Sequence, residues 1–62
     1  MKTYTVIYRD GGKLNFKWHR VLELYTDYTQ ASYKAIEIER MGYKSLVFNT
    51  RALDRIGMPE TY

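Results

Sequence analysis

The chain has 62 residues, which is room for one domain over 1–62, and so short a domain buries a modest share of its surface. It has no cysteine and one histidine, which excludes disulfides and thiolate metal sites; a zinc site would need carboxylates or a second subunit. Ten lysine and arginine residues against seven acidic ones give a net charge of +3, an ordinary mixed surface with a mild basic excess. Stability must therefore come from aromatic packing or from self-association.

The first part of the chain predicts a β-hairpin. Residues 2–9 are rich in β-branched and aromatic types, which is typical of a strand. The step Asp10-Gly11-Gly12 follows at once and predicts the turn, because glycine accepts the positive φ of tight connections. A second strand is expected from residue 14 to residue 25. Its alternation places four large apolar side chains on one face, namely Phe16, Trp18, Leu22 and Leu24.

A helix is predicted next, over residues 28–41. Asp27 is a favoured N-cap residue, and Gln30 stands three positions later at the spacing of a capping box. Gly42 is expected to end the helix at the left-handed C′ position. The helical period predicts a buried stripe with Met41 on its flank, made of Tyr28, Ala31, Ala35 and Ile38.

The remaining residues predict a short strand and then a short helix. Residues 44–49 form the strand, with Leu46 and Phe48 on one face and Val47 on the other. Residues 50–57 predict one or two helical turns capped by Asn49 or Thr50. The side chains expected against the end of the sheet are Leu53, Ile56 and Met58.

These elements predict an α+β fold with ββαβ topology. The order 2-1-3 keeps every neighbouring strand antiparallel and is preferred to 1-2-3. The result is a three-stranded antiparallel sheet with one helix on one face and a short C-terminal helical turn. This order leaves the strand at 14–25, predicted to be the longest, on an edge. Because free edges pair with other chains, we expect self-association through that strand.

Residues 13–20 mix basic and aromatic side chains, which leaves two interpretations open. If the helix covers Phe16 and Trp18, these rings are core, and the opposite sheet face is open and carries Thr3, Thr5, Ile7, Lys17, His19, Val21 and Tyr25. Alternatively the segment binds nucleic acid, since cations neutralise phosphates and rings stack on bases. The candidate nucleic-acid contacts are Lys13, Lys17, His19, Arg20 and Lys44.

The sequence argues against catalysis. His19 is the only side chain that titrates near neutral pH, and neither a cysteine nucleophile nor an acidic residue stands at a motif spacing from it. Gly11-Gly12 is followed by neither a helix start nor a Lys-Ser/Thr step, so it does not predict a phosphate loop. We therefore expect a protein without enzymatic activity, cofactor, metal or small-molecule substrate.

The outer side of the predicted helix offers a candidate partner surface. Tyr33, Ile36 and Arg40 fall away from the buried stripe. Single exposed apolar residues are common on any protein, but aromatic, aliphatic and arginine side chains together are typical of protein-binding patches. We expect this surface to contact a partner or a second subunit.

The chain resembles small proteins of unassigned function encoded by tailed bacteriophages. The resemblance rests on residues 8–12 (YRDGG), 15–21 (NFKWHRV), 38–43 (IERMGY) and 56–62 (IGMPETY). It implies an accessory protein that acts in the bacterial cytoplasm, and it implies no catalytic residues.

The leading functional hypothesis is a non-catalytic accessory protein that docks on a host or phage protein. The alternative is a nucleic-acid-binding module. Ionic strength separates them, because phosphate contacts weaken steeply with salt and apolar docking does not. No apolar run has the length of a signal peptide or a membrane span, so we expect a cytoplasmic protein with no membrane partner.

Overall fold

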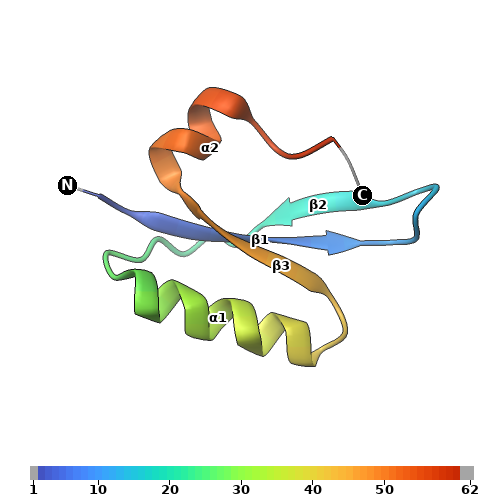
Figure 1. The fold of residues 1–62 in the computed structure, drawn as a ribbon, viewed down its shortest axis with the longest axis horizontal. Coiled ribbons are helices and arrows are strands. Elements are labelled where there is room, and N and C mark those ends of the chain that lie inside the picture. Colours follow the sequence, from blue (N-terminus) through green and yellow to red (C-terminus); the bar gives the residue numbers. More distant parts are fainter. Residues whose placement is uncertain (1, 61–62) are drawn as a thin grey trace.

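The computed structural model describes residues 2–60 and confirms the predicted α+β fold (Figure 1). Met1, Thr61 and Tyr62, which belong to the predicted domain 1–62, lie outside the described residues. The sheet has the order β2-β1-β3, and both neighbouring pairs are antiparallel. The elements in chain order are β1 (Tyr4–Asp10), β2 (Lys17–Arg20), α1 (Tyr28–Arg40), β3 (Lys44–Asn49) and α2 (Thr50–Ile56).

Helix α1 begins and ends where its capping residues predict. The side chain of Asp27 accepts a hydrogen bond from the amide of Thr29 at 3.0 Å, which satisfies one of the free N–H groups of the first turn. Past the last turn, Gly42 takes φ 102°, a conformation that favours glycine. The buried stripe is confirmed for Ala31, Ala35 and Ile38. Tyr28 was wrongly placed in it: this residue is 58% exposed, with its ring edge-on to Tyr4.

The core between α1 and the sheet is built on small helix residues and the even-numbered side of β1. Val6 is completely buried there, with Tyr4, Tyr8 and Val47 packed around it. Ala31 and Ala35 let the helix approach the sheet closely. The buried Ser45 hydroxyl donates a 2.7 Å hydrogen bond to the Ala35 carbonyl oxygen, so this buried polar side chain of β3 is satisfied.

The prediction that residues 14–25 form one long strand with Phe16 and Trp18 under the helix is wrong. Strand β2 has only four residues, and a single bridge between Tyr4 and Tyr25 resumes the pairing. The register places His19 opposite Tyr8 and Trp18 opposite Arg9, so Trp18 points away from α1, with the Arg9 guanidinium over its ring. The core on α1 is completed instead by Val21 and Tyr25, and neither Phe16 nor Trp18 belongs to it.

Tyr25 supplies a pH-dependent contribution to this core. Burial, and then the hydrogen bond that its hydroxyl donates to the Glu23 carboxylate at 2.9 Å, raise the pKa of Tyr25 above 10.0. The folded state therefore holds this proton more tightly than the unfolded chain does. The resulting stabilisation is present below about pH 10 and is lost as the pH rises through the folded-state pKa.

We expect the difference in free energy of unfolding between the native chain and Tyr25→Phe to be constant below about pH 9 and to move against the native chain above about pH 10. Urea unfolding followed by circular dichroism over this pH range measures the difference. The phenylalanine variant removes this ionisable hydroxyl together with its hydrogen bond to Glu23, and the other tyrosines and the lysines are present in both chains, so their titration cancels in the comparison. If the difference in free energy of unfolding between the two chains did not change above about pH 10, the raised pKa of Tyr25 would be contradicted.

The second face of the sheet is not open, contrary to the sequence-based expectation. Thr5 and Ile7 are completely buried, and α1 and α2 lie on opposite sides of the sheet (Figure 1). The α2 side chain Leu53 is 5% exposed, and Asp54 of the same helix forms a 3.3 Å ion pair with Arg20 of β2. Ile56, which was expected to pack there, is 82% exposed, because it lies in the last turn of α2.

The β1–β2 hairpin has a longer connection than the tight turn that its glycines suggest. Residues 11–16 link the strands, and Asn15 closes the loop through two hydrogen bonds with Gly12. The side-chain oxygen of Asn15 accepts from the backbone amide of Gly12, and the backbone amide of Asn15 donates to the carbonyl oxygen of Gly12. Gly11 takes φ 97° directly after β1. The hairpin itself is confirmed.

Candidate functional site

The outer side of α1 exposes the predicted partner residues together. Tyr33 is 68% exposed, Ile36 is 47% exposed, and Arg40 is also exposed. They stand at positions i, i+3 and i+7 of one continuous helix, so they share a face. Because the helix packs through Ala31 and Ala35, this face points away from the sheet.

A shallow hollow on the other flank of α1 shows which way the helix is turned. Its volume is about 420 Å³. It is lined by three residues of α1 and by residues of β1, of the segment just past β2 and of the segment just before β3, namely Lys34, Ile38, Met41, Tyr8, Val21 and Tyr43. The flank with Lys34 and Met41 therefore faces β2. Within the outer face, Ile36 lies toward the opposite flank, on the β3 side of the helix.

Strand β3 is an edge strand whose outer backbone groups have no strand partner within residues 2–60. The Thr50 amide donates to the Thr3 carbonyl at 2.9 Å, and bonded pairs alternate along an antiparallel ladder. Thr3 and Thr50 therefore form a hydrogen-bonded pair, and every second residue of β3 before Thr50 also bonds to β1. The residues between them direct their backbone groups away from β1, namely Ser45, Val47 and Asn49. Ser45 is 5% exposed, so the accessible part of this edge runs from Val47 to Asn49.

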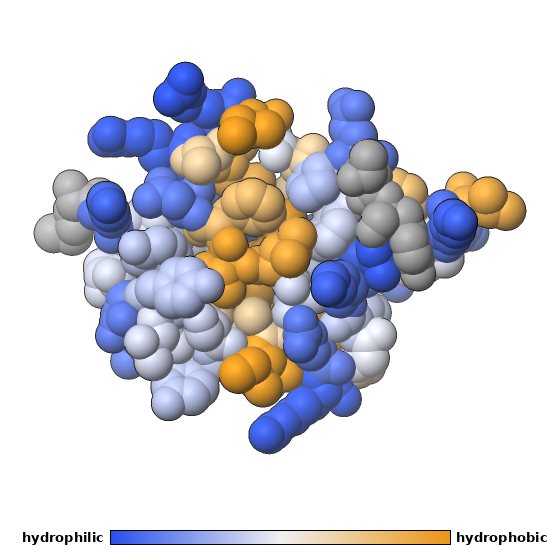
Figure 2. Space-filling view, in the orientation of Figure 1, coloured by the Kyte–Doolittle hydropathy of each residue, from blue (hydrophilic) through white to orange (hydrophobic). Residues whose placement is uncertain are grey.

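An apolar band accompanies this edge. Figure 2 shows orange side chains across the middle of the face in view, from α2 over β3 to α1. In β3, three consecutive apolar residues remain partly exposed, namely Leu46, Val47 and Phe48. Ile36 of α1 extends the apolar area on one side, and Ile56 of α2 is exposed on the other. We call the outer edge of β3 with Leu46, Val47, Phe48, Tyr33, Ile36 and Arg40 the β3–α1 surface.

The predicted nucleic-acid contacts do not form one surface. Lys17 and His19 pair with Asp10 and Tyr8 on the α1 side of the sheet. Arg20 lies on the other side, where its guanidinium is bound to Asp54, and Lys44 shares that side through its pairing with Arg9; Lys13 lies in the hairpin loop. The alternation of a strand separates residues that are adjacent in sequence.

His19 has an acidic neighbour that its sequence position does not reveal. The hairpin brings Asp10 to 3.8 Å from its Nε2 atom, an ion-pair distance longer than a hydrogen bond, and the ring lies 5.3 Å from that of Tyr8. Both side chains are well exposed. This arrangement is that of a surface ion pair at the hairpin.

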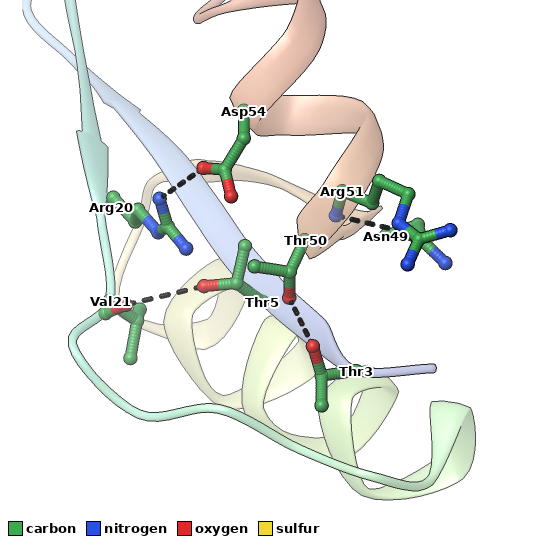
Figure 3. Close-up of polar contacts among 8 residues, drawn as sticks. All are labelled: Thr3, Thr5, Arg20, Val21, Asn49, Thr50, Arg51 and Asp54. Carbon is green, nitrogen blue, oxygen red and sulfur yellow. Dashed lines mark hydrogen bonds and ion pairs between the residues drawn. The ribbon is translucent and has the colours of Figure 1, made fainter. Parts of the chain in front are cut away.

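A basic cleft at the start of α2 was missed by sequence reasoning. It has a volume of about 570 Å³ and lies where β1 begins and β3 ends; its lining residues are Lys2, Thr3, Asn49, Thr50, Arg51, Asp54 and Arg55. The hydroxyl of Thr3 donates to that of Thr50 at 2.9 Å, which holds the two chain segments together (Figure 3). In the sequence, only the i, i+4 spacing of Arg51 and Arg55 on a helix could have indicated this cleft. Lys2 is brought next to these two arginines by the folding of the chain.

Positively charged side chains outnumber negatively charged ones in this cleft. Three cations line it, whereas its single carboxylate, Asp54, is directed at Arg20 (Figure 3). The Asn49 side chain accepts from the Arg51 amide at 2.9 Å and caps α2, which places Arg51 beside the end of β3. The cleft therefore favours a negatively charged group next to the accessible edge.

Within residues 2–60, no three His, Asp or Glu side chains converge where they could hold a metal ion. Neither helix in this part of the chain is long and apolar enough to cross a bilayer. The chain matches no protein-family model, no curated protein sequence and no solved structure.

Proposed function

We propose that this chain is a small non-catalytic accessory protein that docks on another protein through the β3–α1 surface. The observation that carries the proposal is the apolar band over β3 and α1, beside a strand edge with free backbone groups. An edge strand of this kind is a template for pairing with another chain.

The balance between buried and exposed apolar residues supports the same proposal. Among residues 2–60, six apolar residues are buried, two of them alanines, whereas nine large hydrophobic or tyrosine side chains are exposed, and two of these, Tyr33 and Ile36, belong to the β3–α1 surface. A domain of this size has little stability to spare, and covering apolar area on binding adds to it. Interfaces are enriched in tyrosine and arginine, and both stand on the α1 part of the surface.

The resemblance to tailed-phage proteins supports a setting for this activity. We propose that the chain is phage-encoded and that its partner is a protein of the phage or of the bacterial host, met in the cytoplasm. Nucleic acid is the less favoured partner, because the five basic residues suggested by the sequence are divided between two sheet faces and a loop.

Co-purification from bacterial lysate tests the docking surface. We expect the tagged chain to retain a defined protein after nuclease treatment and Ile36→Asp to lose it, because a charge introduced into an apolar contact weakens binding by about 30-fold or more. Leu14→Asp is the matched control: Leu14 is 99% exposed in the hairpin loop, far along the chain from α1. Thermal melting of both variants confirms that each is folded.

Two results would contradict the proposal. Equal retention of the protein by Ile36→Asp and Leu14→Asp would exclude the β3–α1 surface as the docking site. Loss of all bound material on nuclease treatment, together with steep weakening at high salt, would favour the nucleic-acid hypothesis instead.

A further inference from the structure

We infer that the partner contributes an extended segment that adds to the sheet beside β3, apolar where it passes Leu46–Phe48 and acidic where it reaches the cleft of Lys2, Arg51 and Arg55. This inference rests on the proposed function and specifies the kind of partner. Strand addition is a common mode of peptide recognition, in which backbone hydrogen bonds supply affinity and side-chain contacts supply specificity.

The backbone of β3 offers defined positions for such a segment. The amide and carbonyl of Val47 and the amide of Asn49 point outward at the accessible end of the edge. Asn49 is the N-cap of α2, and the carbonyl of an N-cap residue accepts the first hydrogen bond of its helix. The pairing of an added strand with β3 would therefore end at Asn49. Successive residues of an added strand would alternate between the α1 side, next to Ile36 and Val47, and the α2 side, next to Leu46 and Phe48.

The cleft supplies the charge preference. Asn49 is both the last residue of the edge and part of the cleft lining, so a strand that pairs there is carried directly to Arg51. Within residues 2–60, the ion pairs are His19–Asp10, Arg20–Asp54 and Lys34–Glu37, and none involves a cation of the cleft. A carboxylate at the end of the added strand would meet three cations there.

The same charges argue against a second copy of this chain as the occupant. If two β3 strands paired antiparallel about Val47, Lys44 of one copy would lie opposite Thr50 of the other, next to Arg51 and its cleft. Lys44 would then approach the cations of the cleft at both ends of the pair, and the repulsion between these like charges is destabilising. An acidic segment from a different protein removes this conflict.

Fluorescence anisotropy with two synthetic peptides tests the inference. Both peptides have about nine residues with alternating valine and threonine, the length of strand that covers β3 and the cleft. One ends in glutamates and the other in lysines. We expect the glutamate peptide to bind at least about tenfold more tightly at low salt and the gap to shrink as salt is added. Arg51→Glu should reduce the gap by about threefold or more.

Asn49→Pro and Asn49→Ala isolate the backbone contact. Both lose the side-chain cap of α2, but only proline also removes the outward N–H group. Proline fits the position, because Asn49 has φ −65° and lies at a strand edge. We expect Asn49→Pro to bind the glutamate peptide about three- to tenfold more weakly than Asn49→Ala. Circular dichroism verifies that the two variants are equally folded.

Equal affinity for the two peptides, no measurable binding of either, or equal affinity of Asn49→Pro and Asn49→Ala would each overturn the inference. None of these results affects the docking proposal, which is tested by the loss of the partner protein in Ile36→Asp. If that loss occurs while the peptide results are negative, the protein docks through the β3–α1 surface without strand addition.

Discussion

Replacing Ile7 with alanine is expected to lower the free energy of unfolding by about 2–5 kcal/mol, the usual range for truncating a buried large aliphatic side chain. Ile7 has no exposed surface and lies in β1, the central strand, between Arg20 of β2 and Leu46 of β3. A chain of this length has a total stability of about 3–9 kcal/mol. The variant should therefore lose most of its stability, because the cavity opens in β1, which is paired with a strand on both sides.

Urea unfolding followed by circular dichroism measures this loss, and Ile56→Ala is the matched control. Ile56 is the same residue type, but it is 82% exposed in the last turn of α2. Its truncation should change stability by less than about 0.5 kcal/mol. Similar losses for the two variants would show that the face of the sheet under α2 is not a packed core.

Replacing Gly11 with alanine is expected to lower the free energy of unfolding by about 2 kcal/mol or more. Gly11 has φ 97°, and an L-residue held at positive φ costs roughly 1–2 kcal/mol. A Cβ atom there would also lie 2.5 Å from the backbone oxygen of Asn15, so the hairpin loop would have to move. Because this loop sets the pairing of β1 with β2, we expect loss of the His19–Tyr8 ring contact as well.

Gly12→Ala provides the comparison for the same loop. Gly12 has no positive φ, and its added Cβ would meet only the Asn15 side chain, at an ordinary 3.5 Å. This variant should stay within about 0.5 kcal/mol of the native chain or be slightly stabilised, since alanine restricts the unfolded state. Thermal melting of the two variants side by side gives the result, and equal melting temperatures would contradict the strain assigned to Gly11.

Features that depend on residues close together along the chain can be predicted from the amino-acid sequence. The cap at Asp27, the helix end at Gly42 and the strand at Lys44–Asn49 each follow from residues within a few positions, because capping and turn conformations are local. The strand order also followed, since a helix between two strands and a hairpin before it leave few arrangements. The exposure of Tyr33, Ile36 and Arg40 needed only the 3.6-residue period of the helix.

Which face of each strand is covered depends on how the strands and helices pack together, and it could not be predicted from the sequence. A shift of one residue in register moves every side chain to the other face, and the pairing of Tyr8 with His19 sends Trp18 away from α1. The alternation of residues 14–25 carries no information about that register or about the break after Arg20. The basic cleft is likewise a product of the fold, because it joins Lys2 to Arg51 and Arg55 through the pairing of Thr3 with Thr50. Contacts between segments so far apart depend on the packing of the whole chain, which no local pattern specifies.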